Sequence, residues 1–407
     1  MLKCGLLGGK LGHSYSPQIH GLLADYEYKL YERAPEELES FLKSGEFDGL
    51  NVTIPYKKTV IPYCAELSDI ARRLGSVNTI VRRADRSLYG DNTDAFGFVG
   101  LVRHSGVEVA GKRAIVLGSG GASVTVCAML EELGAAKVTV ISRSGEYNYG
   151  NLERVADTQV IVNATPCGMY PNTGVAAVDL HKFPKLEGVL DIVYNPARTA
   201  LLLQAEELGL PNAGGLYMLV AQAKRSSELF MGKTLPDSEI PRIRDAMLRN
   251  MQNIVLVGMP GSGKTTISES LAERLNRPVF DSDVLVRETA GKSAAEIITE
   301  SGEAEFRRQE TAAIAELGKK SGAVIATGGG CITRPENYPL LHQNGVIFWL
   351  KRNLDLLPTD GRPLSQRGRL EEMYAARKDS YARFADFEID NNGSIEETVK
   401  QIVEALG

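Results

Sequence analysis

Residues 253–266 read NIVLVGMPGSGKTT and contain the pattern GxxxxGK[ST] between Gly258 and Thr265. The apolar residues before Gly258 predict a buried strand, and residues 266–275 predict a helix that leaves the glycine-rich turn. In this arrangement, backbone N–H groups surround phosphate oxygens, while the lysine reaches the β- and γ-phosphates and the hydroxyl reaches Mg²⁺. The stretch therefore predicts a nucleotide phosphate site that contains Lys264 and Thr265.

A loop of this kind normally opens a domain, so the residues before it are expected to form a separate folded unit. The length of 407 residues is enough for two or three domains. The composition is 43% hydrophobic and 24% charged, which is ordinary for a soluble globular protein. A net charge of −5 without a basic cluster gives no electrostatic footprint for nucleic acid.

The cysteines and the first residues of the chain bear on the cellular compartment of the protein. The five cysteines are scattered and never form a CxxC pair, which argues against a disulfide framework and against a zinc site. The first residues lack both a long apolar run and a small-residue cleavage site. We therefore expect a cytoplasmic protein without a membrane partner. The sequence does not indicate an oligomeric state.

Residues 1–100 alternate between short apolar runs and helix-like stretches, a β/α rhythm. Polar clusters follow the expected strands or open the expected helices, where open α/β sheets gather ligands. Each cluster alone also fits ordinary turn and capping chemistry. Together they offer hydroxyls, amides, one lysine and one carboxylate, which suit a small polyol acid. The expected strands are residues 2–7, 50–54 and 79–81, and the helix-like stretches are residues 35–44 and 63–74.

Residues 112–141 predict a dinucleotide-binding βαβ unit, with a strand, the turn GSGGAS, a helix from residue 124 and a second strand. The third glycine of the GxGxxG fingerprint is replaced by Ser123. An arginine between two serines ends the second strand, and this favours a 2′-phosphate and hence NADP. The expected cofactor residues are Gly118, Ser119, Gly120, Gly121, Ala122, Ser123, Ser142, Arg143, Ser144 and Gly215.

Residues 1–250 carry the motifs SxSP, NVTxPxK, GSVNT, GxNTD, GxGGAS, NATPxGM, DxVYNPxxT and GGLxMLVxQA in this order. In these motifs the chain resembles shikimate dehydrogenase. The resemblance implies a substrate domain over residues 1–100, completed by helices of residues 216–250, and a Rossmann-like NADP domain over residues 101–215. It implies that the substrate is held by Ser14, Ser16, Asn51, Thr53, Lys57, Asn78, Asp94, Tyr194 and Gln222.

The resemblance makes Lys57 and Asp94 the catalytic pair. Ketone reduction needs a hydride on carbon and a proton on oxygen, and an ammonium beside the carbonyl stabilises the developing alkoxide. The alternative is a surface ion pair of little consequence. Two features depart from the family: Glu146 and Tyr147 stand where a second basic residue is frequent, and residues 143–163 form a short connection. We expect weaker phosphate selectivity and one missing peripheral helix or strand.

Residues 252–407 carry DxD, GExEFR, GGG and RPL in order and resemble shikimate kinase. The resemblance implies that shikimate is bound by Asp283, Arg307, Gly328, Gly329, Gly330 and Arg377. Asp283 would also orient or deprotonate the attacking hydroxyl. The nucleotide would be held by Gly258, Pro260, Gly261, Ser262, Gly263, Lys264, Thr265, Thr266 and Arg362, with Lys264 and Arg362 at the phosphates and Thr265 and Asp281 at Mg²⁺.

The plainer interpretation of this second set is that the aspartates cap a helix and the arginines are solvated. The segment of residues 353–361 is short. It offers no counterpart of the arginine that in this family stacks on adenine before the lid. The helix expected last covers residues 395–406.

The expected fold class is thus α/β throughout: a substrate domain, a Rossmann-like domain and a P-loop kinase domain of the nucleoside-monophosphate-kinase type. The expected function is reduction of 3-dehydroshikimate to shikimate with NADP(H), followed by phosphorylation of shikimate with ATP and Mg²⁺. Two alternatives remain open: one half is a decayed binding or regulatory module, or the dehydrogenase is a quinate/shikimate type that uses NAD.

Overall fold

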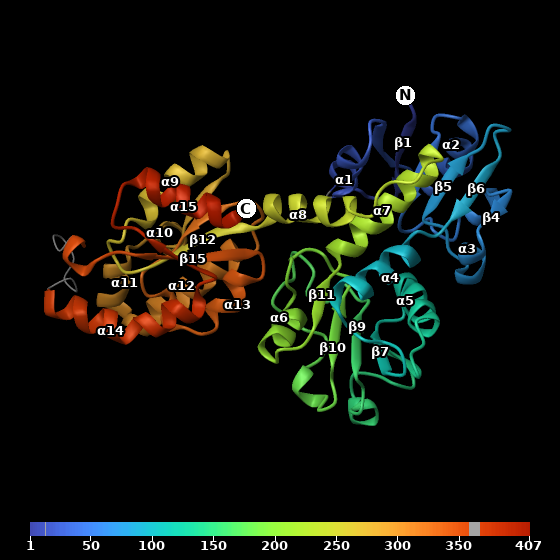
Figure 1. The fold of residues 1–407 in the computed structure, drawn as a ribbon. Helices are drawn as coiled ribbons and strands as arrows, with labels where there is room; N and C mark the ends of the chain where they lie inside the picture. Colours follow the sequence, from blue (N-terminus) through green and yellow to red (C-terminus); the bar gives the residue numbers. More distant parts are fainter. Residues whose placement is uncertain (13, 358–366) are drawn as a thin grey trace. The chain divides into compact units, whose positions relative to one another are not determined.

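The computed structural model describes residues 1–12, 14–357 and 367–407. The chain divides into two compact units. The first contains Met1–Met169, Val175–Tyr194 and Leu201–Met247, and the second contains Tyr170–Gly174, Asn195–Ala200 and Leu248–Gly407. Each unit is described separately below, and Figure 1 labels their helices and strands.

The first unit begins with a mixed six-stranded sheet of order β2-β1-β3-β5-β6-β4. Strand β1 runs parallel to β2 and β3, whereas β5 runs antiparallel to β3 and β6. Its core contains Phe41, Phe47, Leu50 and Ile80. The strands are β1 (Lys3–Gly8), β2 (Glu27–Glu32), β3 (Gly49–Val52), β4 (Glu66–Leu67), β5 (Thr79–Arg82) and β6 (Leu88–Asp91), and the helices are α1 (Ser16–Leu23), α2 (Leu38–Ser44) and α3 (Asp69–Leu74).

The helix-like stretch expected over residues 63–74 is helical only from Asp69, and this part of the expectation is wrong. The Ser68 side chain accepts a hydrogen bond from the Ala71 N–H and so starts α3 at this point. The residues just before it form β4, which pairs with β6.

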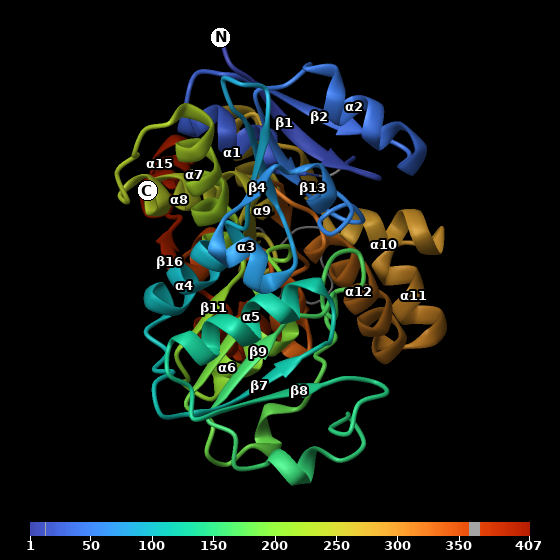
Figure 2. The same ribbon diagram turned by 90° about the vertical axis from the view of Figure 1, so that its right-hand side faces the viewer.

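The second sheet of this unit is fully parallel, with the order β11-β10-β9-β7-β8. Alternate strand residues face opposite sides: Val116 packs in one core with α4 and α5, and Ile115 packs in the other with α6. Figure 2 shows α5 in front of this sheet. The strands are β7 (Arg113–Leu117), β8 (Lys137–Ile141), β9 (Val160–Asn163), β10 (Gly188–Asp191) and β11 (Asn212–Gly214), and the helices are α4 (Asp94–Ser105), α5 (Gly121–Glu132) and α6 (Ala200–Glu207).

The short connection between β8 and β9 contains a single 3₁₀ turn, η3 (Leu152–Val155), and no α-helix. This agrees with the short spacing in the sequence. Helix α5 begins at Gly121, earlier than the expected residue 124, because Gly121, Ala122 and Ser123 of the expected turn already belong to its first turn.

Helix α7 (Leu216–Met231) returns to the start of the chain and packs against α1 and α4. The Ser227 hydroxyl hydrogen-bonds the Tyr26 hydroxyl at 2.8 Å across this contact. One residue, Gln252, separates helix α8 (Glu239–Met251) from β12, which begins at Asn253. The connection between the two units is therefore very short, because the helix continues almost to the start of the strand.

The second unit contains a parallel sheet of order β13-β14-β12-β15-β16. One face of β12 packs with α9 and α15, and the other packs with α12, α13 and α14. Figure 2 shows α10, α11 and α12 grouped together. The strands are β12 (Asn253–Val257), β13 (Val279–Asp281), β14 (Val324–Ala326), β15 (Gly345–Lys351) and β16 (Phe387–Asp390). The helices are α9 (Lys264–Leu275), α10 (Ser282–Ala290), α11 (Ala294–Ser301), α12 (Glu303–Gly318), α13 (Asn337–His342), α14 (Arg367–Phe384) and α15 (Ile395–Leu406).

Two further features of this unit matter below. Trp349, the single tryptophan of the chain, lies on β15 and stacks on Tyr381 with ring centroids 5.5 Å apart. The segment Asn195–Ala200 belongs to this unit because the Ala197 N–H donates to Asn344 Oδ1 at 2.8 Å and the Arg198 N–H donates to the Gln343 carbonyl at 2.9 Å.

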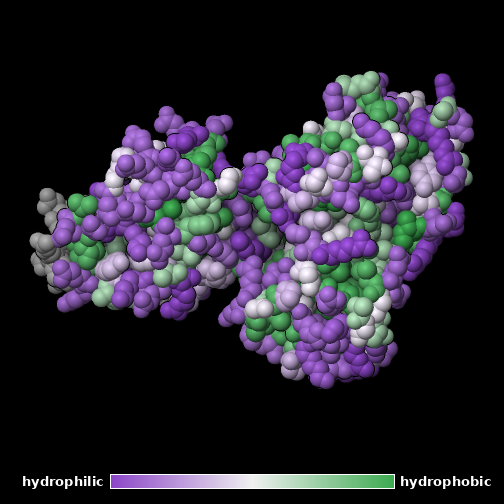
Figure 3. Space-filling model, in the orientation of Figure 1, coloured by the Kyte–Doolittle hydropathy of each residue, from purple (hydrophilic) through white to green (hydrophobic). Residues whose placement is uncertain are grey.

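Hydrophilic side chains cover most of the face seen in Figure 3, with apolar side chains scattered between them. Among the described residues, no helix is both long and apolar enough to cross a membrane.

Candidate active sites

The first unit contains a cavity of about 260 Å³. Every residue that the sequence predicts for the polyol acid lines it, although these residues come from distant parts of the chain. Tyr15, Ile192, Met218 and Leu219 also line the cavity and were not predicted. The predicted residues that it brings together are Ser14, Ser16, Asn51, Thr53, Lys57, Asn78, Asp94, Tyr194 and Gln222.

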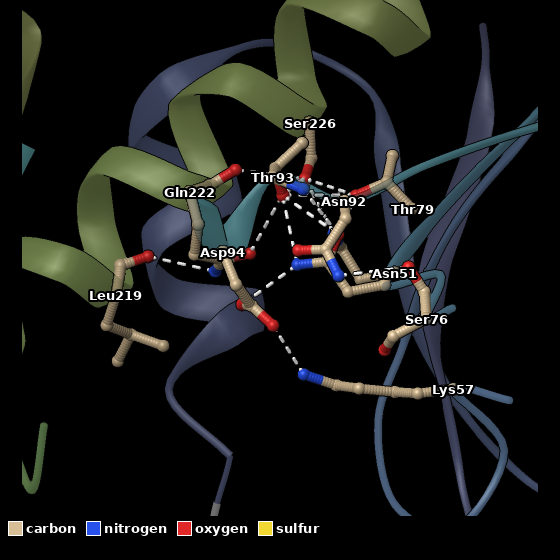
Figure 4. Close-up of polar contacts among 11 residues, drawn as sticks. Asn51, Lys57, Ser76, Thr79, Asn92, Thr93, Asp94, Leu219, Gln222 and Ser226 are labelled. Carbon is tan, nitrogen blue, oxygen red and sulfur yellow. Dashed lines mark hydrogen bonds and ion pairs between the residues drawn. The ribbon is translucent and has the colours of Figure 1, made fainter. Parts of the chain in front are cut away.

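Lys57 and Asp94 form an ion pair inside this cavity, as Figure 4 shows. Lys57 Nζ donates to Asp94 Oδ2 at 2.6 Å, and Asn78 Nδ2 donates to Asp94 Oδ1 at 2.9 Å. The Lys57 side chain is 29% exposed and the Asp94 side chain 17%. Both carboxylate oxygens therefore have a donor, so the carboxylate is held in one orientation and keeps the ammonium at the cavity wall.

A buried hydroxyl cluster lies behind these groups. Ser226 Oγ accepts from Asn51 Nδ2 at 2.7 Å and lies 2.9 Å from Thr79 Oγ1 and 3.0 Å from Thr93 Oγ1. It donates to the Gln222 carbonyl at 2.9 Å, one turn earlier on α7. All three hydroxyls are buried, and Figure 4 shows the contacts between them. The cluster was not predicted, and its only signal in the sequence is polar residues on the inward face of an amphipathic helix.

Asn51 is also held from its other side. The Tyr28 hydroxyl donates to Asn51 Oδ1 at 2.8 Å. The His20 ring stacks on Tyr28 with centroids 4.0 Å apart and hydrogen-bonds the Tyr26 hydroxyl through Nδ1. Burial lowers the pKa of His20 to about 3, so the ring is neutral at physiological pH.

The glycine-rich turn after β7 fits a bound dinucleotide. Gly118 has φ +103°, and a Cβ there would lie 2.7 Å from Thr165 Cγ2, so only glycine fits. The turn leads into the N-terminus of α5, where N–H groups can receive phosphate. Of the predicted cofactor residues, Ala122 and Gly215 reach the substrate cavity.

Arg143 and its flanking serines directly follow β8, as predicted. Glu146, which departs from the family pattern, pairs with Arg154 at 3.0 Å, and the Arg154 guanidinium lies over the Tyr147 ring at 4.5 Å. The carboxylate near the expected 2′-phosphate position is therefore already compensated by a cation.

The second unit contains a cavity of about 540 Å³ above the carboxyl ends of its strands. Gly258 and Ser262 belong to the phosphate loop but do not line it. Arg362 lies outside the described residues. The predicted residues that line the cavity are Pro260, Gly261, Gly263, Lys264, Thr265, Thr266, Asp281, Asp283, Arg307, Gly328, Gly329, Gly330 and Arg377.

The phosphate loop has a shape that only glycine adopts readily. Gly261 and Gly263 have φ +83° and +86°. Lys264 Nζ donates to the carbonyl oxygens of Gly258 and Met259 at 2.8 and 3.0 Å, which folds the side chain back over the loop. The ammonium and the N–H groups of the loop thus form a concave positive surface that suits a phosphate chain.

The predicted Mg²⁺ residues are neighbours. Thr265 Oγ1 donates to Asp281 Oδ2 at 3.1 Å. Asp281 Oδ1 accepts from the N–H of Asp283 and so caps α10, which means that the capping interpretation is correct for Asp281. One carboxylate and one hydroxyl suit Mg²⁺, which completes its shell with water and phosphate oxygens.

The opposite end of this cavity is built around Arg307 and a residue that was not predicted, Glu310. Arg307 Nη1 donates to Glu310 Oε2 at 2.8 Å, and the Glu310 side chain is 0% exposed. Burial raises the pKa of the Glu310 carboxyl, while Arg307 opposes this shift. A Cβ on Gly328 would lie 2.5 Å from Glu310 Oε1 and 2.7 Å from Asp283 Oδ1, so the glycines allow these carboxylates to approach the loop.

Arg377 and Tyr381 hold the glycine run from α14. Arg377 Nη1 and the Tyr381 hydroxyl both donate to the Gly329 carbonyl, at 3.2 and 2.6 Å. These two hydrogen bonds fix the orientation of the Gly329 carbonyl.

Comparison with known proteins assigns both units. Residues 6–80 match the shikimate dehydrogenase substrate binding domain, and residues 260–407 match shikimate kinase. A shikimate dehydrogenase (NADP(+)) from Clostridium perfringens strain SM101 is 37% identical over 249 residues, which cover 56% of this chain and 92% of the relative.

The chain belongs to the shikimate dehydrogenase family. A chorismate mutase/shikimate 5-dehydrogenase fusion protein from Clostridium acetobutylicum is similar in structure, with a TM-score of 0.58 and 34% identity, over 60% of this chain and 97% of that one. Shikimate 5-dehydrogenase from Thermus thermophilus in complex with NADP(H) and shikimate has a TM-score of 0.55 and 29% identity, over 60% and 99%.

These findings confirm the expected α/β fold class and the expected bifunctional shikimate-pathway enzyme. The first unit is a shikimate dehydrogenase that uses NADP, and the second is a shikimate kinase domain that uses ATP with Mg²⁺.

Proposed function

We propose that the dehydrogenase half reduces 3-dehydroshikimate to shikimate at the Lys57–Asp94 pair. The observation that supports this most directly is the double hydrogen bonding of Asp94, by Lys57 and by Asn78. Bound NADPH supplies the hydride. Lys57 donates its hydrogen bond, and then a proton, to the ketone oxygen as negative charge develops there. Asp94 keeps Lys57 charged and directed at that oxygen.

The remaining cavity residues are proposed to hold the ring substituents of the substrate. Ser14 and Ser16 stand at the start of α1, where hydroxyls and N–H groups suit a carboxylate. Asn51, Thr53 and Gln222 supply amides and a hydroxyl on the other walls and suit the ring hydroxyls. Arg143 is proposed to bind the 2′-phosphate of the cofactor, flanked by Ser142 and Ser144.

The kinase half is proposed to transfer the γ-phosphoryl group of ATP to the 3-hydroxyl of shikimate. Arg307 and Arg377 are proposed to bind the shikimate carboxylate, because charged guanidinium groups match carboxylate geometry. Asp283 accepts the hydrogen of the attacking hydroxyl and so orients it toward the phosphorus. Lys264 stabilises charge on the phosphate chain, while Thr265 and Asp281 hold Mg²⁺. The sequence adds Arg362 to the phosphate-binding residues.

We further propose three functional domains: residues 1–100 completed by the helices of residues 216–250, residues 101–215, and residues 252–407. The packing of α7 on α1 and α4 supports the first of them. An enzyme that consumes NADPH and ATP is expected in the cytoplasm, which supplies both.

A coupled assay tests the proposal. The intact chain is mixed with dehydroshikimate, NADPH and Mg-ATP, and NADPH loss is followed together with shikimate 3-phosphate. Both signals are expected, with phosphorylation dependent on prior reduction. Parallel reactions with quinate, and with NAD in place of NADP, test the alternative specificity. Faster oxidation of quinate with NAD than of shikimate with NADP would overturn the assignment of the first half.

A further inference from the structure

In the kinase half, different strands lie on the two sides of the phosphate loop. The loop follows β12, the central strand. Asp281 ends β13 and Gly328 follows β14, so both lie on one side of β12. On the other side lie β15 and β16, which contribute nothing to the predicted site. Because the strands are parallel, the chain segments that leave all five of them lie at the same edge of the sheet.

Arg352 is the first residue after β15. Its Nη1 lies 3.9 Å from the point where a Cβ on Gly263 would stand, so the guanidinium is next to the phosphate loop. Asn391, the first residue after β16, also touches the loop, because its Nδ2 donates to the Ser262 carbonyl. The segments that follow β15 and β16 therefore each place a side chain next to the loop.

The guanidinium of Arg352 has no counter-ion among the described residues. Its Nε is buried and has no hydrogen-bond partner in the part of the chain that the structure describes. The preceding residue, Lys351, differs in this respect because it pairs with Glu388 at 2.9 Å. A partly buried cation without a carboxylate partner is costly unless an anion compensates it. The phosphate loop beside it is a place where a strongly charged anion binds.

The two sides of the loop suggest which part of the nucleotide approaches Arg352. The transferred phosphoryl group must face Asp281, Thr265 and Asp283, on the β13 and β14 side. The remainder of the nucleotide then extends toward β15 and β16. We propose that Arg352 binds the end of the nucleotide that is not transferred, with its guanidinium at the phosphate chain on the adenosine side. Arginine suits this task because its fork of donors matches phosphate oxygens.

This proposal rests on the kinase function and adds a nucleotide-binding residue to it. Titration calorimetry of the intact chain with ADP tests it, with saturating NADP⁺ present to block adenine binding in the dehydrogenase half. The Arg352→Ala variant is expected to raise the Kd for ADP about tenfold or more, as for loss of a charge-assisted hydrogen bond. The KM for shikimate in the ATP-dependent phosphorylation assay, run without NADP⁺ so that the dehydrogenase half does not oxidise the substrate, should change less than about twofold, because Arg352 lies on the other side of the loop.

The Lys351→Ala variant is the matched control: it removes the neighbouring cation, and its ADP affinity should remain that of the parent chain. Arg352→Gln replaces Arg352→Ala if the latter does not fold. An unchanged ADP Kd in the Arg352 variant would overturn the proposal, and so would equal losses of ADP and shikimate binding. Failure of the parent chain to bind ADP at all would instead contradict the kinase function, so the two failures are distinguishable.

Discussion

Asp94 Oδ2 accepts a hydrogen bond from the ammonium of Lys57 at 2.6 Å, although the two residues are 37 positions apart in the chain. Lys57 follows β3, whereas Asp94 opens α4, and Asn78 fixes the second oxygen of Asp94 at 2.9 Å. The pair therefore depends on β3, β5 and α4 being assembled, and no local segment can form it alone.

We expect the two activities to be separable by single substitutions. Lys57→Ala should abolish NADPH oxidation with dehydroshikimate and leave ATP-dependent phosphorylation of added shikimate intact, because the described residues that line the kinase cavity belong to the second unit. Lys264→Ala should do the reverse. Both rates are measured on each variant. If either change stopped both reactions in a folded protein, two independent sites would be the wrong description.

Ser226 should matter for the dehydrogenase although it does not line the cavity. Ser226→Ala removes the hydroxyl that contacts Asn51, Thr79 and Thr93. Loss of one such hydrogen bond costs about 1 kcal/mol, or roughly fivefold. We expect the KM for shikimate to rise by about this factor. Ser105→Ala is the control, because its hydroxyl contacts the Val102 carbonyl and the Val107 N–H, neither of which lines the cavity. Equal effects of both variants would mean general loosening of the dehydrogenase half.

Arg143 should determine the preference for NADPH. Removing one charge-assisted contact with a phosphate costs about 1.5–3 kcal/mol, so Arg143→Ala should raise the KM for NADPH roughly ten- to a hundredfold. The KM for NADH should change much less, because NADH has no 2′-phosphate, and it serves as the internal control in the same steady-state assay. Similar losses with both cofactors would place Arg143 elsewhere.

The sequence predicts local structure best where spacing and turn chemistry decide it. The closing helix over residues 395–406 coincides with α15, and the strand before the phosphate loop coincides with β12 to within one residue. The strand β2, EYKLYE, was not predicted, because a charged edge strand resembles a solvent-exposed segment until β1 pairs with it.

The buried polar residues were missed for a related reason. Ser226 meets Thr93 across 133 positions, and Glu310 is buried only because α12 packs above the glycine run. From the sequence alone, polar residues on a helix are expected to face solvent, because their buried partners come together only in the tertiary structure. The cavity-lining residues were predictable because each belongs to a short motif at the end of a strand or the start of a helix.

Glu310 should control shikimate binding through Arg307. Glu310→Gln removes the buried charge that holds the guanidinium, so we expect the KM for shikimate in the kinase reaction to rise roughly tenfold, with a smaller change in kcat. Glu303→Gln is the matched control, because Glu303 also pairs with Arg307 but is 65% exposed. A change below about twofold is expected there. A pure kcat loss in Glu310→Gln would assign it to phosphoryl transfer instead.

His20 should make the dehydrogenase half sensitive to acid. Its pKa is about 3 in the folded protein and near 6.5 when unfolded, so between these values only the unfolded chain binds the proton. The free energy of unfolding therefore falls as pH falls through this window, by up to about 1.4 kcal/mol per pH unit.

Denaturant unfolding at pH 7, 6 and 5, followed by circular dichroism, measures this dependence. The transition of the dehydrogenase half is identified as the one that added NADP⁺ moves to higher denaturant concentration, because the cofactor binds only the folded form. His20→Phe should flatten the pH dependence of that transition relative to the parent chain. Parallel pH profiles for the two proteins would show that His20 is not the responsible group.

Trp349 is an intrinsic fluorescent probe of the kinase half. As the only indole of the chain, it reports on the kinase half alone, and its stacking on Tyr381 connects its emission to the Gly329 loop. NADPH bound to the dehydrogenase half absorbs light in the range where tryptophan emits. The efficiency of resonance energy transfer from Trp349 to that cofactor therefore depends on the distance between the two halves, and it can be followed during turnover without an attached dye.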